Sequence, residues 1–290
     1  MLLCEQPPDN FDVFDTLKWI QLTSAGYSQI LDLPVLQRGI RVTNGLGNFD
    51  IPIAEWNLMM VLMWHRHMLE LLENQKNSVW DRDAKFQVEL RGTRLGFYGY
   101  GGIARETARL AKHMGLEVWV MTRDGTIKTR ENIYRVAGSG DPEGQLPDRV
   151  FGPSQMDQFL SQVDYLLLTL PLGPATEGII GEKELQLLKR TSVLINPARG
   201  PLVDLKALVR CLQEKWIRGA SFDAHYAYPL PPDHPVWSLP NMILTPHISG
   251  SAAGTHFLER IYDIFVQNLQ RYCAGEPLLN ELSEAQLQGK

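Results

Sequence analysis

The chain has 290 residues, 44% of them hydrophobic, and a formal net charge of −5 at neutral pH. This length allows one large domain or two of ordinary size, with enough apolar content for packed cores. The acidic balance argues against a nucleic-acid partner, whose phosphates need clustered lysine and arginine. Three cysteines, none in a C-x-x-C pair, exclude a disulfide framework and indicate a reducing, cytoplasmic setting. We see no secretory signal, and the longest apolar run, residues 58–64, is too short to span a membrane.

The N-terminal part of the chain predicts two short strands followed by a helix. The strands are expected in "LKWIQLTSAG" (17–26) and "GIRVTN" (39–44), and the helix over about 53–75. His65 and His67 are two positions apart on that helix and therefore do not share a face. We interpret both as packing or surface residues and expect no metal site.

The middle of the chain alternates apolar runs with segments of helical length. A helix is predicted over 103–114, and strands are predicted at 94–99, 116–121, 163–170, 192–198, 219–224 and 241–247. Strands that are apolar on both faces and separated by helices are typical of a parallel sheet covered on both sides. The sequence therefore predicts an α/β fold with a doubly wound, Rossmann-type parallel sheet.

Two further segments flank or interrupt this pattern. Residues 124–150, rich in Gly, Asp and Pro, predict a loop that is unusually long for a compact domain, and such loops are often functional or mobile. Near the C-terminus a helix is predicted to end at Gly275. Its apolar face is formed by Leu258, Ile261, Phe265, Leu269 and Tyr272. The flanking pieces predict one smaller domain that the chain visits twice.

The motif "GYGGIA" follows a predicted strand and opens a predicted helix, which is typical of a dinucleotide-binding turn. Gly99 permits the tight turn, Gly101 lets the backbone approach a pyrophosphate, and Ala104 is small enough for close packing of helix and sheet. Gly102 and Ile103 begin the helix, where free N–H groups and the helix dipole favour phosphate.

The end of the next predicted strand bears on which dinucleotide binds. An acidic residue there would accept hydrogen bonds from the adenosine ribose and repel a 2′-phosphate. Thr122 occupies that position, followed by Arg123, with Lys128 and Arg130 in the loop beyond. A neutral residue beside a guanidinium suits a phosphate, so NADP(H) is favoured and NAD(H) is possible. In the alternative interpretation, Asp124 binds the ribose and the basic residues are merely solvated.

Taken together, the motifs resemble the D-isomer-specific 2-hydroxyacid dehydrogenase family, particularly its glyoxylate/hydroxypyruvate reductase-like members. The resemblance runs in order through "LKWIQLTSAGYSQI", "VTNGLGNFDIPIAEW", "ELRGTRLGFYGYGGIA", "INPARGPLVD", "LPPDHPVWSLPNMILTPHISG" and "GEPLLN". It implies a flavodoxin-like substrate domain over 1–72 and 253–290 and a Rossmann domain over 73–252. It also implies hydride exchange between a nicotinamide and a small 2-oxo or 2-hydroxy acid of D configuration, and a homodimer.

The resemblance also implies roles for particular residues. Arg199 in "NPARG" would bind the carboxylate and carbonyl of the substrate, and His247 in "TPHISG" would be the acid/base. Asp223 would hold the nicotinamide carboxamide. The backbone N–H groups of Ala25 and Gly26 in "TSAGY" would bind the substrate carboxylate.

The chemistry asks for the same residue types. A guanidinium binds a planar 2-oxo acid in a bidentate way, and a nearby cation with a proton donor lowers the barrier to carbonyl reduction. Histidine exchanges protons near neutral pH. Each residue also has a purely structural interpretation. In it, Arg199 caps a strand–loop junction, and His247 is a hydrogen-bonded, packed histidine behind Pro246.

The sequence departs from the family beside Asp223. Five residues later, before Pro229, the family has a glutamate that hydrogen-bonds the catalytic histidine, whereas this chain has Tyr228. A phenol supplies no full charge, so we expect His247 to keep its role with a lower pKa. His225 and Tyr226 either face the cleft and narrow it or pack against the neighbouring domain, and the sequence does not separate these alternatives.

Two functions follow, a 2-oxo acid reductase and a catalytically impaired NAD(P)-binding protein of the same fold. Arg199, Asp223 and His247 together favour the enzyme. Family members usually have another strand and helix before "LKWIQ", where this chain has sixteen residues. We therefore expect either a reduced substrate domain or a chain that starts late.

Overall fold

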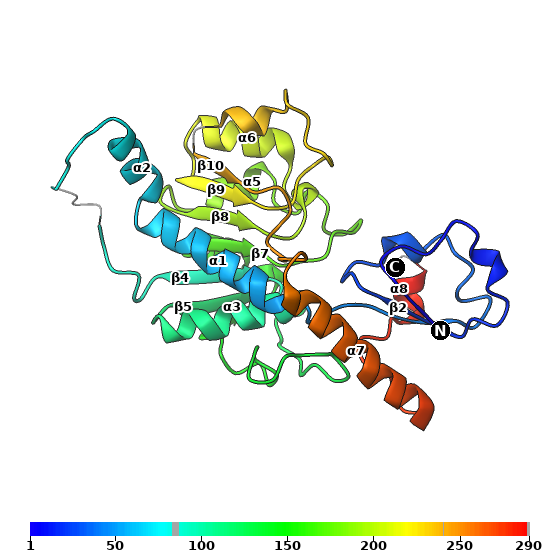
Figure 1. Cartoon of the computed structure of the whole chain (residues 1–290). Helices are drawn as coiled ribbons and strands as arrows, with labels where there is room; N and C mark the ends of the chain where they lie inside the picture. The colour runs from blue at the N-terminus through cyan, green and yellow to red at the C-terminus, as the bar shows by residue number, and fades with distance from the viewer. Residues whose placement is uncertain (83–86, 240, 289–290) are drawn as a thin grey trace. The chain divides into compact units, whose positions relative to one another are not determined.

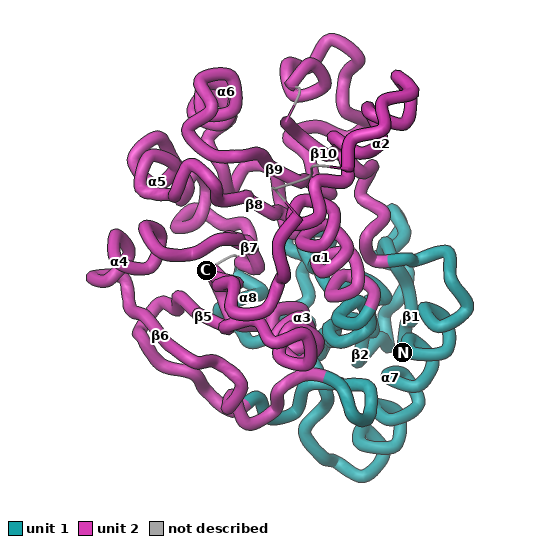
Figure 2. The backbone as a smooth tube through the Cα atoms, turned by 90° about the vertical axis from the view of Figure 1, so that its left-hand side faces the viewer, with its two compact units in different colours: residues 1–51, 130–139, 251–290 teal, residues 52–129, 140–250 magenta. Residues whose placement is uncertain are grey.

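The computed structural model of the chain describes residues 1–82, 87–239 and 241–288. The chain divides into two compact units (Figure 2). Unit 1 comprises Met1–Ile51, Arg130–Ser139 and Ser251–Lys290, and unit 2 comprises Pro52–Thr129 and Gly140–Gly250. Within the described ranges, no helix is both long enough and apolar enough to cross a membrane.

Unit 2 contains a seven-stranded sheet in the order β10-β9-β8-β7-β4-β5-β6 (Figure 1). Its strands are β4 (Arg94–Tyr98), β5 (Glu117–Met121), β6 (Arg149–Phe151), β7 (Tyr165–Leu168), β8 (Val193–Asn196), β9 (Gly219–Phe222) and β10 (Met242–Leu244). All neighbouring pairs are parallel. The order reverses direction between β4 and β7, which is where such sheets bind ligands at the carboxyl ends of their strands. The predicted doubly wound α/β fold is confirmed.

Successive residues of a strand point to opposite faces of the sheet, and in these strands the residues on both faces are mainly apolar. Helices therefore cover both faces. The helices are α1 (Asp50–His65, which belongs to unit 2 from Pro52 onward), α2 (Met68–Lys76), α3 (Gly102–His113), α4 (Met156–Leu160), α5 (Glu182–Leu187) and α6 (Leu205–Gln213). One core joins α1 and α3 to one face, through residues such as Trp56, Ala104 and Leu167. The other joins α4, α5 and α6 to the opposite face, through residues such as Phe159 and Leu166.

Unit 1 is built on a parallel sheet in the order β1-β2-β3. The strands of this sheet are β1 (Leu2–Cys4), β2 (Trp19–Leu22) and β3 (Arg41–Thr43). The α-helices of unit 1 are α7 (Thr255–Ala274) and α8 (Glu284–Leu287). Trp19 stacks on Phe265 and Tyr272, which the sequence places on one face of α7. The helix stops as predicted at Gly275, whose φ is 72°. Both predicted strands of this part are confirmed, and β1 was not predicted.

The predicted single helix over 53–75 is wrong in one respect. It is interrupted after His65, because His67 adopts a left-handed backbone with φ of 50° before α2 begins. The predicted long loop contains no helix, but its last residues form β6 on the edge of the sheet.

The compact units differ from the predicted domain boundaries in three places, the smallest being the return to unit 1 at Ser251 rather than at residue 253. The chain passes to unit 2 after Ile51 rather than after residue 72, because Trp56, Met60 and Trp64 of α1 are buried in the core of that unit. Residues 130–139 of the long loop belong to unit 1. The assignment of a substrate role and a cofactor role to the two units stays a prediction.

Candidate active site

The turn between β4 and α3 has the backbone that its glycines were predicted to serve. Gly99 has φ of 92°, and a Cβ there would lie 2.9 Å from a methyl group of Leu170. At Gly101 a Cβ would meet no described atom within 4 Å, so open space lies in front of this residue. Ala104 is fully buried, which lets α3 pack closely on the sheet. The turn therefore leaves room for a ligand beside the backbone.

The first turn of α3 offers hydrogen-bond donors at this place. In the described part of the chain, no side chain caps the helix at Gly101. The first N–H groups of a helix have no partner within the helix, so those at Gly102 and Ile103 are available to an anion. The turn joins β4, at the point where the strand order reverses.

The end of β5 carries an unsatisfied polar atom. The Oγ1 of Thr122 is buried and has no hydrogen-bond partner within the described residues. Arg123 is exposed, and it forms no ion pair with any part of the chain that the structure describes. Asp124 accepts hydrogen bonds from Lys128 Nζ at 2.9 Å and from the backbone N–H of Thr126 at 3.1 Å. These contacts, led by Lys128, lower the pKa of Asp124 and commit its carboxylate to its own turn.

Arg130, the last of the predicted basic residues, belongs to unit 1. Burial lowers the pKa of its guanidinium, and the neighbouring charge of Asp50 partly opposes that shift. Arg130 is therefore engaged within unit 1.

His247 lies in a sharply bent segment after β10, which we call the His247 turn (residues 245–249). The backbone N–H of His247 donates to the Thr245 carbonyl at 3.0 Å, and its own φ is 57°. The left-handed region is unfavourable for a residue with a Cβ, so contacts from outside must hold this conformation.

Asp223, at the end of β9, supplies such contacts. Its buried carboxylate accepts hydrogen bonds from the Thr245 hydroxyl at 2.5 Å and from the backbone N–H groups of Ile248 and Ser249 at 3.0 Å. The Ser249 hydroxyl donates to it as well, at 2.5 Å. Four hydrogen bonds are about the full capacity of a carboxylate. The geometry therefore gives Asp223 the task of holding the His247 turn, and its predicted contact with the nicotinamide stays a prediction.

Arg199 follows β8 and is exposed. Its position is set by Asn196, whose Oδ1 accepts from the Arg199 N–H at 3.2 Å and whose Nδ2 donates to the Arg199 carbonyl at 2.8 Å. The guanidinium donates to the neighbouring Ala198 carbonyl at 2.6 Å. The strand end thus presents the guanidinium to solvent rather than burying it.

Burial and a neighbouring positive charge lower the pKa of the His247 imidazole. Partial burial is the largest cause, followed by the positive charge of Arg199, and His225 acts in the same direction. The carboxylate of Asp223 opposes them. Arg199 and Asp223 are therefore close enough to His247 to influence it. The catalytic roles that the resemblance implies for Arg199 and His247 stay predictions.

Tyr228 contacts His247 through its ring. The two ring centroids are 5.2 Å apart and the planes are tilted by 47°. The Tyr228 hydroxyl accepts a hydrogen bond from the backbone N–H of His225 at 2.9 Å. The phenol therefore packs against the imidazole, while its hydroxyl anchors the segment after β9.

His225 and Tyr226, whose placement the sequence left open, are packed. His225 is buried, with Nε2 2.7 Å from the Thr245 carbonyl oxygen. Tyr226 donates its hydroxyl to the Val203 carbonyl at 3.0 Å and stacks on His234. Both side chains therefore make these contacts within unit 2, and a role in narrowing the substrate cleft stays a prediction.

The predicted carboxylate-binding residues lie in unit 1, in the loop after β2. The Ala25 carbonyl accepts from Asn44 Nδ2 at 2.8 Å, and the Gly26 carbonyl accepts from Ser24 Oγ at 2.8 Å. The first contact fixes the peptide unit that carries the Gly26 N–H. The Ser24 carbonyl, which shares its peptide unit with the Ala25 N–H, accepts from the Gly45 N–H at 2.8 Å. Within the described residues neither of these two N–H groups has a hydrogen-bond partner.

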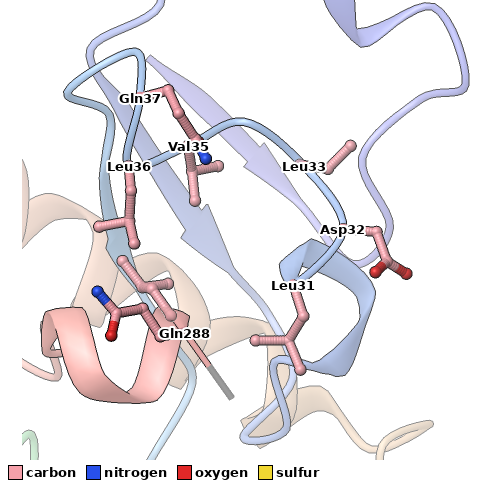
Figure 3. A pocket seen from close by; sticks show the side chains of 8 residues that line it. Leu31, Asp32, Leu33, Val35, Leu36, Gln37 and Gln288 are labelled. Carbon is pink, nitrogen blue, oxygen red and sulfur yellow. The ribbon is translucent and has the colours of Figure 1, made fainter. Parts of the chain in front are cut away.

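Two other predicted or visible features lie apart from these residues. His65 is buried with Nδ1 3.1 Å from the Tyr165 hydroxyl, and His67 pairs with Glu70, so both have the packing and surface roles that we expected. A shallow pocket of about 410 Å³ in unit 1 is lined mainly by leucines of the segment before β3 and by α8 (Figure 3). None of the predicted site residues lines it.

The residues that hold the His247 turn were missed by sequence reasoning. Thr245 and Ser249 flank His247 symmetrically in "TPHIS", and this spacing was the available signal. Asn196, which precedes "PARG" by one residue, was likewise visible as a polar residue at the end of an apolar strand. The hydrogen-bond partners of Thr245 and Ser249 are determined by the packing of strands that are distant in the sequence.

A doubly wound parallel sheet with a glycine turn at its switch point, and with an arginine and a histidine near one another, is typical of dinucleotide-binding oxidoreductases. The profile described as "D-isomer specific 2-hydroxyacid dehydrogenase, NAD binding domain" matches residues 58–249. The chain belongs to the D-isomer-specific 2-hydroxyacid dehydrogenase family, and it is a 2-hydroxyacid dehydrogenase.

Individual proteins show the same relationship. The glyoxylate reductase of Thermofilum pendens is 31% identical over 270 residues, which are 91% of this chain and 74% of that protein. The crystal structure of a family protein from Aeromonas salmonicida aligns with a TM-score of 0.80 at 26% identity, covering 97% of this chain and 84% of that one. A family member from Xanthobacter autotrophicus, in complex with NADPH and MES, aligns with a TM-score of 0.78 at 27% identity, covering 98% and 84%.

Proposed function

We propose that the protein reduces a small 2-oxo acid, of the glyoxylate or hydroxypyruvate kind, to its D-2-hydroxy acid with NADPH. The observation that carries this proposal is the placement of the Arg199 guanidinium close enough to His247 to influence its pKa, with both held by polar residues at strand ends. A small acid is favoured because the Thermofilum relative is a glyoxylate reductase.

The roles of the residues follow from their chemistry. When bound, the cofactor supplies the hydride. Arg199 binds the carboxylate and the carbonyl oxygen, and its charge stabilises that oxygen as it becomes negative. His247 in its imidazolium form donates a proton to the same oxygen. The N–H groups of Ala25 and Gly26 bind the carboxylate.

The residues at the glycine turn and at the end of β5 fit a dinucleotide. The open space at Gly101 and the uncapped start of α3 suit the pyrophosphate, and the buried, unpaired Thr122 hydroxyl suits a polar group of the adenosine ribose. NADP(H) is favoured over NAD(H), because Arg123 is exposed while Asp124 is paired with Lys128. The structurally similar Xanthobacter protein was crystallised with NADPH. In this proposal unit 2 is the cofactor domain and unit 1 the substrate domain.

We propose further that the protein acts as a homodimer in the cytoplasm. Apolar side chains are exposed at Met59 and Leu62 on α1 and at Met68 and Leu72 on α2. Trp80, which follows α2, is 87% exposed. Exposed apolar residues spaced three or four positions apart on a helix share a face and are typical of protein interfaces, and a second copy of the chain is the occupant that the family resemblance implies.

The proposed activity is tested by following oxidation of NADPH and NADH against a panel of 2-oxo acids between pH 5 and 8. We expect turnover with glyoxylate or hydroxypyruvate that is faster with NADPH and increases toward acidic pH. The alternative, a non-catalytic dinucleotide-binding protein, predicts quenching or enhancement of nicotinamide fluorescence on binding with no turnover of any acid in the panel.

A further inference from the structure

His225 is a buried histidine to which the proposed chemistry gives no task. It lies two residues beyond Asp223, and 6% of its surface is exposed. Its Nε2 is 2.7 Å from the carbonyl oxygen of Thr245. Because a carbonyl oxygen can only accept, Nε2 carries the proton in this contact and donates it.

The Thr245 carbonyl is the closing point of the His247 turn. It accepts the backbone N–H of His247 at 3.0 Å as well as the imidazole N–H of His225. A hydrogen bond between residues i and i+2 closes a three-residue turn, here around Pro246, whose ring fixes its own φ. The orientation of the His247 backbone therefore depends on the position of the Thr245 carbonyl.

We propose that His225 is a positioning residue for His247. Its Nε2–H fixes the Thr245 carbonyl, while Asp223 fixes the Thr245 hydroxyl and the N–H groups that follow His247. Held at both its carbonyl and its hydroxyl, Thr245 sets the backbone from which the imidazole of His247 approaches the carbonyl oxygen of the substrate. This inference rests on the proposed role of His247 as proton donor.

The surroundings of His225 distinguish this role from simple packing. Tyr226, the next residue, is held by the Val203 carbonyl and by stacking on His234, and within the described residues its side chain makes no hydrogen bond to the His247 turn. The backbone N–H of His225 binds the Tyr228 hydroxyl, and the Tyr228 ring lies on His247. His225 thus joins its own segment to the turn through its side chain and to Tyr228 through its backbone. The charged groups that influence His247 are Arg199, Asp223 and His225 itself.

The test compares His225→Gln with His225→Phe. Glutamine places an amide N–H at about the reach of Nε2, whereas phenylalanine keeps a flat ring and removes the donor. We expect His225→Phe to lower kcat by about ten- to a hundredfold, as misplacement of a catalytic group by an ångström does, with KM for the 2-oxo acid within about threefold of the wild type. His225→Gln should restore most of kcat.

Two controls make the comparison decisive. Tyr226→Phe removes a buried hydrogen bond from the same segment without touching the His247 turn, so it should match the wild-type kcat. His225→Asn, whose amide stops short of the Thr245 carbonyl, should behave like His225→Phe and serves if that variant does not fold. Wild-type kcat in the variants that lack the donor, or an equal loss in His225→Gln, would overturn the proposal.

A second readout separates this inference from the proposed function. The imidazole NMR signals of His247 should move in His225→Phe and stay near their wild-type positions in His225→Gln, whether or not the protein reduces 2-oxo acids. Absence of turnover in the wild type would contradict the proposed function but would leave the positioning role of His225 intact. Unchanged imidazole NMR signals of His247 in His225→Phe would refute the positioning role of His225.

Discussion

The phenol of Tyr228 meets the imidazole of His247 ring against ring, at the position where the family resemblance places a glutamate. A carboxylate there would stabilise the imidazolium, whereas a phenol does not. The carboxylate of Asp223 raises the pKa of His247, but burial and Arg199 outweigh it, so the net shift is downward. His247 therefore loses its proton at a lower pH than an ordinary histidine.

This arrangement predicts the pH dependence of reduction. Because the imidazolium is the donor and its pKa is lowered, kcat/KM should fall as pH rises through a limb on the acidic side of the ordinary histidine range. Tyr228→Glu should move that limb to higher pH, with roughly a tenfold change in protonated fraction for each unit of pKa. Tyr228→Gln, similar in length but uncharged, is the control and should leave the limb in place. A limb that does not move in Tyr228→Glu would refute the electrostatic explanation.

The residue types at the site could be predicted from the chemistry and the sequence motifs, but their hydrogen-bond partners could not. Arginine, histidine and the missing glutamate were readable at 199, 247 and 228. The four hydrogen bonds that fill Asp223 join β9 to the segment after β10, and this pairing depends on strands that are neighbours only in the folded sheet. No local pattern in the sequence specifies it.

At the scale of elements, strands that are buried on both faces were predictable because they read as continuous apolar runs. The elements that were missed are short. β1 and β6 have three residues each, which is too short for a strand pattern to show, and the first two residues of β6 are exposed. The break between α1 and α2 rests on the left-handed backbone of His67, which no glycine or proline marks.

The junction between β5 and the loop after it makes a prediction about cofactor preference. Asp124 is bound by Lys128 and Thr126, which leaves the Arg123 guanidinium to bind a 2′-phosphate. A charge-assisted contact of this kind contributes about 1.5–3 kcal/mol. Arg123→Ala should therefore raise KM for NADPH by roughly ten- to a hundredfold and change KM for NADH little.

The control for that measurement is Arg210→Ala, which removes an exposed arginine of α6 that is paired with Glu182 and Glu214. It should leave both values of KM near those of the wild type. If Arg123→Ala affects NADPH and NADH equally, Arg123 does not recognise the 2′-phosphate.

At the scale of the whole molecule, the chain passes between its two units four times, because residues 130–139 of the long loop belong to unit 1. That segment is bound within unit 1 by Asn280, which accepts from the Tyr134 N–H at 3.0 Å and donates its own N–H to the Asn132 carbonyl at 2.8 Å. The sequence predicted a long loop, and it gave no indication that the middle of the loop belongs to the other unit. Hydrogen bonds from residues almost 150 positions away determine that.

The exposed apolar residues of α1 and α2 predict self-association. We expect sedimentation equilibrium to show a dimer, and Leu62→Asp to shift it toward the monomer, because a charge cannot be buried unpaired in an apolar interface. Val13→Asp, at an exposed apolar position of unit 1, is the matched control and should remain dimeric. A wild-type protein that sediments as a monomer at tens of micromolar would exclude the proposed interface.

The central claim is that Arg199 and His247 act on one carbonyl group. The most direct measurement is steady-state reduction of glyoxylate and hydroxypyruvate with NADPH by the wild type, Arg199→Gln and His247→Gln. The account predicts that Arg199→Gln mainly raises KM for the acid, and that His247→Gln lowers kcat by about a hundredfold or more with KM for NADPH unchanged. Wild-type kcat in His247→Gln, or an unchanged KM for the acid in Arg199→Gln, would contradict it.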